Sequence, residues 1–315
     1  MKRPLRSSRM CGFSLIELMV GLLLGLIVTG AAIAVFLSNQ NAYRSTEGLG
    51  RVQEGMRTAF ELMAQDLRAA GSNGCNNSST PTNGLTLNTG NWWAVALSGN
   101  TWTTNALTGY EQGTDFDTGT PSIGSSTGSR VSATDAVQLF SAGDVSVSVA
   151  ADDGGSAFTV NSSDHDFVAS DMLLVCDANY AAVFNATSVS GTSIGHPTFS
   201  HTYYDSAQVA TLTRLNAVRW YVAYNSDGGT SLYRSRVYAG AEQTEEVVAD
   251  VSDLQLTYLV SGATSYVAAS AVSDWSAVTA VRIELTVDSP DKVGTDGKVL
   301  SRELVAVVEL RNRLT

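Results

Sequence analysis

One carboxylate, that of Glu17, lies near the start of a long apolar run, GFSLIELMVGLLLGLIVTGAAIAVFL, which extends from Gly12 to Leu37. A membrane-spanning helix needs about 20 apolar residues, and the segment from Phe13 to Leu37 supplies that length. A carboxylate within lipid costs at least about 2.5 kcal/mol, so an ionisable residue at such a position indicates a functional site with a specific partner. The first question that the sequence poses is therefore which group pairs with Glu17.

A short basic segment precedes the apolar run. It contains no acidic residue and four basic ones: Lys2, Arg3, Arg6 and Arg9. A basic flank stays on the cytoplasmic side, so the C-terminal end of the helix is expected to point outward. Three kinds of processing are compatible with such a start: a secretory signal cut after the apolar run, a lipoprotein, and a cut between Gly12 and Phe13. The run is longer than a secretory signal needs and Cys11 precedes it, so the third kind, which leaves the span on the mature chain, is favoured.

The segment Gly12 to Val20, GFSLIELMV, resembles the start of the type IV pilin family. The resemblance implies that a prepilin peptidase cuts after Gly12 and methylates the new amine of Phe13. The ammonium at Phe13 would then pair with Glu17 of a neighbouring subunit in a medium of low dielectric constant. Removing one partner of a buried ion pair costs about 3–5 kcal/mol, so such a pair would fix the axial register between subunits. The alternative is a signal anchor that carries an unrelated glutamate.

The long helix is expected to continue beyond the apolar run and to become amphipathic. Apolar residues recur every three or four positions, as on one face of a helix: Leu49, Val52, Met56, Phe60, Met63, Leu67 and Ala70. The turn signal GSNG begins at Gly71 and ends the pattern. The expected organisation is a leader (1–12), a transmembrane half-helix (13–37), an amphipathic half-helix (38–71), a Ser/Thr/Gly/Asn-rich loop region (72–130) and a β head domain (131–315).

The strand signals of the head predict an antiparallel sheet. Alternating or apolar runs with turn residues between them occur at 135–140, 145–149, 172–176, 181–184, 217–224, 232–238, 254–260, 281–287 and 300–310, the last of them more fully apolar. A hairpin is expected around Asp177 and another around the turn NSDGG at 225–229. A long helix followed by many strands indicates an α+β fold, in which the helix lies on one face of the sheet.

Three segments of this second part strengthen the resemblance and make it more specific. They are LVCD at 174–177, VADVSDLQLTY at 248–258 and WSAVTAVRIEL at 275–285, and Cys75 just after the helix is similar too. Together they resemble the minor pilins of the type IV pilin family, whereas residues 78–130 carry no such match. The resemblance implies a low-abundance subunit that primes pilus assembly together with other minor pilins and the major pilin, near the fibre tip.

The chain has three cysteines, and Cys11 leaves with the leader. Cys75 and Cys176 remain in an exported domain, where disulfides persist, so we expect them to form a disulfide; the alternative is two free thiols. A metal site is not expected from two cysteines without a nearby pair of histidines.

Composition excludes several other functions. The net charge is −11, and loss of the leader leaves 15 basic against 30 acidic residues, or −15. Such acidity argues against nucleic acid as a partner. Two G-x-S-x-G strings, at 124–128 and 191–195, lack the strand-to-helix context of a hydrolase elbow. No catalytic residue and no cofactor is therefore expected.

The remaining candidates for ligand binding are interpreted as structural. His165, His196 and His201 lack the spacing of a zinc motif, and His196 and His201 are expected to be loop residues rather than ligands. The segments 152–154 and 288–297 offer clustered acids, but neither fits an EF-hand loop, so we expect solvated turns. The aromatics Trp92, Trp93, Trp102 and Tyr110 are expected to cover a small apolar cluster under the loops. The alternative is that they bind a partner or a sugar.

Two alternative functions stay open at this stage. One is a J-type pseudopilin of a type II secretion pseudopilus, and the other is a tip adhesin that binds a surface through residues 78–130. All three readings place the precursor in the bacterial inner membrane with its head in the periplasm. The pilus reading then moves it to the cell surface.

Overall fold

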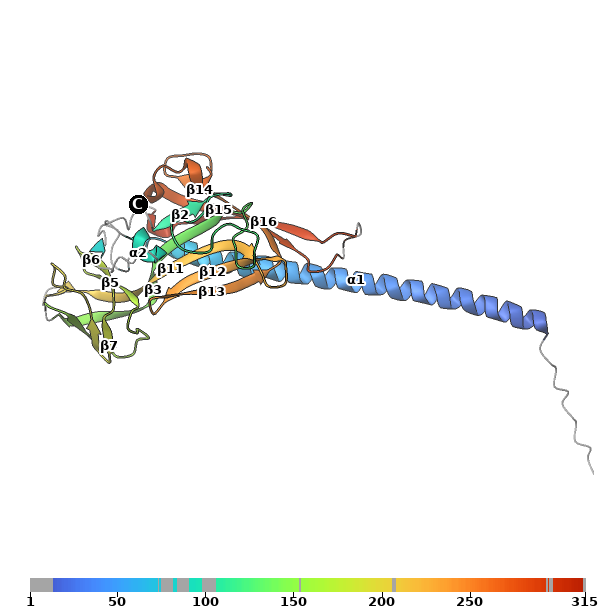
Figure 1. Ribbon diagram of the computed structural model, residues 1–315, viewed down its shortest axis with the longest axis horizontal. Helices are drawn as coiled ribbons and strands as arrows, with labels where there is room; N and C mark the ends of the chain where they lie inside the picture. The colour runs from blue at the N-terminus through green and yellow to red at the C-terminus, as the bar shows by residue number, and fades with distance from the viewer. Residues whose placement is uncertain are drawn as a thin grey trace, which may run out of the picture.

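The computed structural model describes residues 14–72, 74, 82–83, 91–97, 106–152, 154–205, 208–292, 294 and 297–313. Helix α1 (Leu15–Ala69) is one continuous element of 55 residues, which corresponds to about 83 Å. Its first half projects from the head as a rod, and its second half runs along the head (Figure 1). The helix ends where Gly71 adopts the left-handed conformation, φ 77°, and donates its N–H to the carbonyl of Phe140 at 2.9 Å. The predicted long helix is confirmed.

The second half of α1 buries the predicted stripe. Val52, Met63 and Leu67 are buried, whereas Met56 and Phe60 are half-buried against the same core. Small residues complete the buried face, and the apolar pattern did not indicate them: Gly48, Ala59 and Ala64. Small side chains let the strands approach the helix closely, which a stripe of large residues alone would prevent.

Most strands join one sheet of 11 strands. Its members are β1 (Thr82–Asn83), β2 (Leu107–Tyr110), β3 (Ala136–Asp152), β4 (Ala157–Val160), β5 (Met172–Cys176), β6 (Ala181–Asn185), β7 (Ser188–Ser190), β8 (Ser193–Gly195), β11 (Thr211–Tyr224), β12 (Thr230–Tyr238) and β13 (Ala241–Ala249). The path runs β1-β6-β5-β11-β3-β4-β8-β7, with β12 beside β11, β13 beside β12 and β2 beside β3. Pairing between these strands is antiparallel except for β1 with β6. The α+β prediction is confirmed.

A second sheet has the order β14-β15-β16, and its strands are β14 (Val251–Val260), β15 (Val278–Asp288) and β16 (Ser301–Glu309). The smaller elements are α2 (Trp92–Ala96), the hairpin β9 (Tyr204–Asp205) with β10 (Gln208–Val209), and the 3-10 turns η1 (Ala269–Ala271), η2 (Trp275–Ala277) and η3 (Arg311–Arg313). The main core lies where α1 meets both sheets, with Trp220 and Leu232 from one sheet and Ile283 from the other.

Both predicted hairpins are present. β5 and β6 pair on either side of the turn at Asp177, and β11 and β12 pair on either side of 225–229. In the second turn the Asn225 side chain accepts the N–H of Gly229 at 2.9 Å, and Gly228 supplies a φ of 82°. The turn residues act through the local hydrogen bonds and positive φ that favour them there.

One expectation needs correction. The predicted fully apolar strand at 300–310 is β16, an edge strand whose outer side chains Val305 and Val307 are each 49% exposed. Only one face of this sheet packs against the core, so two of the strand's three valines face solvent while Val308 is buried. In the region 72–130, where loops with some short strands were expected, the described residues include the short elements β1, α2 and β2, and Trp92 and Trp93 of α2 are buried.

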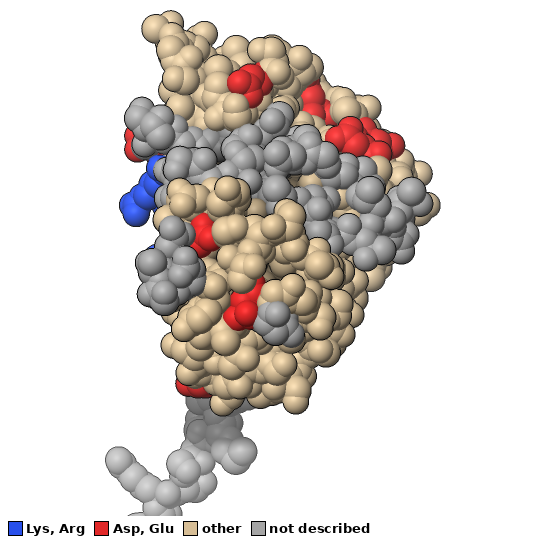
Figure 2. Space-filling model, turned by 90° about the vertical axis from the view of Figure 1, so that its left-hand side faces the viewer, with Lys and Arg blue, Asp and Glu red and all other residues tan. Residues whose placement is uncertain are grey.

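The end of the head that lies away from the projecting helix carries scattered acidic side chains, and basic ones show at one edge (Figure 2). This distribution agrees with the acidic composition of the chain.

Candidate assembly interface

The apolar half of α1 packs against none of the residues that the structure describes. Its most apolar stretch of 18 residues is entirely exposed. By length and composition this helix is able to cross a membrane. Exposure of so many apolar side chains to water would be unfavourable at about 25 cal/mol per Å². The rod therefore requires a membrane or the helices of other subunits around it.

Glu17 lies in the first turn of α1, where it has a local partner. Its Oε2 accepts the N–H of Ser14, the N-cap residue, at 3.4 Å. A side chain that caps a helix in this way satisfies one of the four N–H groups left open at the N-terminus. This contact is long for an N–H···O bond, so it holds the carboxylate only weakly. Gly12 and Phe13 lie outside the described residues.

A polar joint fastens the second half of α1 to the large sheet. The Asp66 carboxylate accepts the indole N–H of Trp220 at 2.9 Å and an N–H of Arg234 at 2.9 Å. Burial raises the pKa of the Asp66 carboxyl above its ordinary value, against the lowering effect of the Arg234 charge and the Trp220 hydrogen bond. The Arg234 guanidinium also lies over the Trp220 ring, 5.5 Å from its centroid. The apolar pattern did not reveal this joint.

We expect Asp66→Ala to lower the free energy of unfolding of the head by about 2–3 kcal/mol. This loss is smaller than the roughly 3–5 kcal/mol for breaking a fully buried pair, because both side chains keep some solvent contact. Urea unfolding of the full chain in detergent, followed by tryptophan fluorescence, measures it. The matched control is Glu61→Ala, which removes the exposed pair with Arg57 and should cost under about 0.5 kcal/mol. Equal losses in the two variants would contradict the assigned role of the joint.

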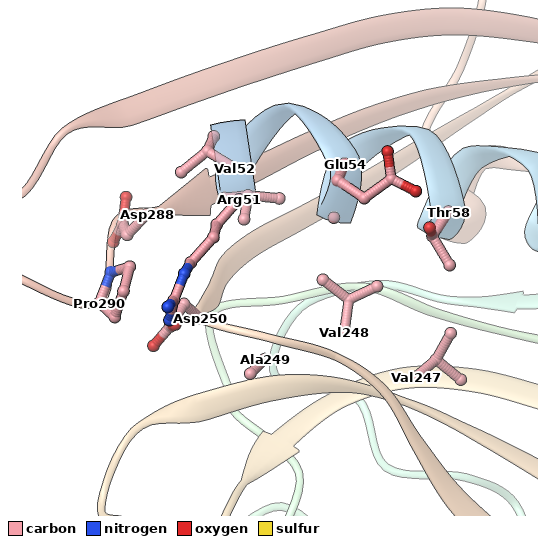
Figure 3. Close-up of a pocket in the computed structure, with 12 residues that line it drawn as sticks. Arg51, Val52, Glu54, Thr58, Val247, Val248, Ala249, Asp250, Asp288 and Pro290 are labelled. Carbon is pink, nitrogen blue, oxygen red and sulfur yellow. The ribbon is translucent and has the colours of Figure 1, made fainter. Parts of the chain in front are cut away.

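A cleft of about 400 Å³ lies where α1 leaves the head, between the helix and the ends of β13 and β15. Val247 and Val248 face the helix across it, and the Arg51 side chain extends from the helix toward Asp250 (Figure 3). The helix comes close at Gly55, where a Cβ atom would lie 3.0 Å from Val248 Cγ1. The cleft thus marks the boundary between the packed and projecting halves of α1.

The structure places Cys176 at the end of β5, where it is fully buried. Cys75 lies outside the described residues, but its neighbour Gly74 is described. A Cβ atom at Gly74 would lie 3.6 Å from Thr213 Cγ2, and Thr213 pairs with Leu174 of β5.

The serine motifs occupy turns. Residues 124–128 lie in a turn where Gly128 donates to the carbonyl of Tyr224, and residues 191–195 span the β7–β8 hairpin and β8. Neither joins a strand to a helix, so the hydrolase elbow is not formed.

Each of the three histidines contacts a different part of the protein, and these contacts are structural. His196 is buried and stacks on Phe158 at 3.8 Å, and His201 binds the Asp177 carboxylate at 2.6 Å. His165 binds the carbonyl of Gly191 at 3.0 Å. Among the described residues no group of three or more His, Cys, Asp or Glu side chains is arranged to hold a metal ion.

The acidic segments considered for calcium are only partly described. Asp152 accepts the N–H of Gly154 within the local turn and the N–H of the distant Tyr203, and Asp153 and Asp296 lie outside the described residues. Of the aromatics, Trp92, Trp93 and Tyr110 are buried in apolar clusters, whereas Trp102 lies outside the described residues.

Comparison with known families bears on both ends of the chain. The family model Type IV Pilus-assembly protein W, PilW, matches residues 219–308, which run from within β11 to β16. The prokaryotic N-terminal methylation motif matches residues 7–33, which include Gly12, Phe13 and Glu17. No curated protein and no solved structure matches the chain. These two matches, together with the projecting apolar helix and the antiparallel β head, support a PilW-like type IV pilin, and they fit a membrane-anchored precursor that is later assembled into the pilus.

Proposed function

We propose that this minor pilin helps to prime type IV pilus assembly as a low-abundance subunit near the fibre tip. The observation that carries the proposal is the coincidence of two features at the N-terminus. The methylation motif covers residues 7–33. The most apolar stretch of α1 is entirely exposed in the described structure. Other minor pilins and the major pilin, whose helices would cover this surface, are the proposed partners. The PilW match favours a pilus over a J-type pseudopilus.

The proposed processing supplies the chemistry for assembly. Prepilin peptidase would cut between Gly12 and Phe13 and methylate the amine of Phe13. Glu17 of one subunit would then leave its weak contact with Ser14, 3.4 Å long, for the ammonium of the next subunit. The attraction between two opposite charges is strong in a medium of low dielectric constant, whereas the contact with Ser14 is long, and both facts favour the exchange.

Deletion of this chain tests the priming role. We expect the deletion strain to make far fewer pili, with those that remain of ordinary length, because initiation rather than elongation would be affected. Counting fibres by electron microscopy and blotting sheared pili for the major pilin measure both quantities. Re-expression of the chain should restore the count. An unchanged number of fibres, with surface attachment lost, would instead support the adhesin alternative and contradict priming.

We also propose the disulfide between Cys75 and Cys176. The position of Gly74 beside Thr213, close to the end of β5, supports it because consecutive Cα atoms are only about 3.8 Å apart. It would close a loop of roughly 100 residues, for which measured disulfides contribute about 2–4 kcal/mol.

We therefore expect Cys176→Ser to lower the free energy of unfolding of the oxidised protein by about 2–4 kcal/mol, to the level of the reduced wild type. Chemical unfolding with and without a reducing agent checks this. The matched control is Cys11→Ser, which should have no effect on the processed protein because that residue leaves with the leader. If reduction left the stability of the wild type unchanged, the disulfide would be ruled out.

A further inference from the structure

A second pocket lies at the end of the head farthest from the projecting helix. It has a volume of about 440 Å³ and is formed by the β5–β6 turn and the segment 200–204. β5 pairs with the first residues of β11, Thr211 to Arg214, whereas Trp220, further along β11, contacts α1. The pocket is therefore displaced along β11 from the helix, and Figure 1 shows β5 and β6 at the far end of the head.

Exposed aromatic side chains gather at this pocket. Of the head residues that the structure describes, three large aromatics are exposed: Tyr180 at 54%, Tyr204 at 41% and Tyr238 at 38%. Two of the three, Tyr180 and Tyr204, line the pocket. Aromatic rings beside a few fixed polar groups are typical of sites for small ligands. The faces of such rings suit ligands that have both C–H and O–H groups.

The polar side of the pocket is held in place without a ligand. The buried Asp177 carboxylate accepts the N–H groups of Asn179 and Tyr180, each at 2.7 Å, and the Nε2–H of His201 at 2.6 Å. The His201 ring also stacks on Tyr180, with the centroids 4.1 Å apart, and contacts Tyr203 edge-on at 4.9 Å. A preorganised site of this kind loses little conformational entropy when it binds.

The same contacts fix the chemistry that the pocket offers. Burial works to raise the pKa of Asp177, but the two N–H groups and the His201 ring outweigh it, so the pKa lies below its ordinary value. The ionised carboxylate requires a hydrogen on His201 Nε2, which leaves Nδ1 to accept a hydrogen bond when the ring is neutral. Ser200 and Thr202 add hydroxyl groups to the lining.

Charge narrows the class of ligand. The lining contains no Lys or Arg, and the distal face shows scattered acids with basic side chains at one edge (Figure 2). An anionic ligand would meet no cation there. A cationic ligand would find both oxygens of Asp177 already engaged. Neutral hydroxyl groups both donate and accept hydrogen bonds. They therefore match the polar groups that the lining leaves available, namely His201 Nδ1 and the hydroxyls of Ser200 and Thr202.

We propose that this distal pocket binds a neutral carbohydrate, with a sugar ring against Tyr180 and Tyr204 and a sugar hydroxyl on His201. The proposal does not rest on a role in pilus priming, because binding is a property of the purified chain. The proposed site differs from that of the adhesin alternative, which would bind through residues 78–130.

The test uses the full chain in a polyoxyethylene detergent, which carries neither sugar nor ammonium groups. The probes are methyl glycosides of glucose, galactose, mannose and N-acetylglucosamine, and binding is followed by saturation-transfer NMR with titration. We expect saturable binding of at least one probe with a Kd on the order of 1 mM. Tyr180→Ala, Tyr204→Ala and His201→Ala should each weaken it at least about tenfold, with the thermal unfolding midpoint checked for each variant.

Tyr238→Ala is the matched control, since it removes an exposed tyrosine of the head that does not line the pocket, and it should leave binding unchanged. Absence of binding by all four glycosides would overturn the proposal. Binding that survives all three pocket substitutions would overturn the site. Tighter binding of choline than of any glycoside would overturn the ligand class.

Discussion

Glu17→Ala is expected to leave the protein inserted in the membrane and to lower its recovery in sheared pili at least about tenfold. The span keeps its length and gains hydropathy, so insertion should be undisturbed. Assembly loses the carboxylate that would pair with the ammonium of Phe13 on a neighbouring subunit, and an unpaired buried charge costs about 3–5 kcal/mol. Immunoblots of the membrane fraction and of the sheared-pilus fraction measure the two effects separately.

Two further variants sharpen this test. Glu17→Gln keeps a side-chain oxygen that can accept the N–H of Ser14 but lacks the charge, so it should fail as alanine does if the ion pair is what matters. Full recovery of the glutamine variant would assign Glu17 to helix capping instead. Glu47→Ala removes an exposed acid of the same helix, paired with Arg51, and should assemble normally.

Gly12→Leu is expected to abolish processing and to accumulate a precursor heavier by the mass of residues 1–12. The proposed peptidase must bring its catalytic groups against the backbone at the bond between Gly12 and Phe13, and a bulky side chain would obstruct that approach. Intact-mass spectrometry and N-terminal sequencing of the membrane fraction detect the change. The wild type should begin at a methylated Phe13.

The control for the cleavage site is Gly21→Leu, a glycine of the same apolar run with nothing within 4 Å of its Cβ position. The Gly21→Leu variant should be processed normally, because Gly21 lies well beyond the scissile bond, whereas Gly12 is next to it. Normal processing of Gly12→Leu would place the cut elsewhere. A wild-type protein that still began at Met1 would remove the proposed ammonium, and with it the partner of Glu17.

Local patterns accounted for the elements whose signals are local. The three-to-four spacing from Val52 to Leu67 indicated the buried face of α1, and the turn at Asn225 indicated a hairpin that the structure confirms. The exposure of Val305 was not predicted, because an apolar run alone does not show whether another element covers both of its faces.

Features built from distant segments were beyond the reach of the sequence pattern. Asp66 is separated from Trp220 and Arg234 by more than 150 positions, and a single acid on a helix gives no sign of such partners. The distal pocket likewise needs the turn at Asp177 to meet His201, which the order of β5, β6 and β11 brings about. Residue types alone therefore predicted the anchor better than the head.

The end of α1 has a mechanical consequence. The two residues that follow Ala70 are hydrogen-bonded to β3. The N–H of Gly71 donates to the carbonyl of Phe140 at 2.9 Å, and the N–H of Ala142 donates to the carbonyl of Ser72 at 2.8 Å. Tension applied along the rod would thus be shared with β3 through these two hydrogen bonds. The head of a subunit held in this way would keep its position relative to α1 when a fibre that contains it is under tension.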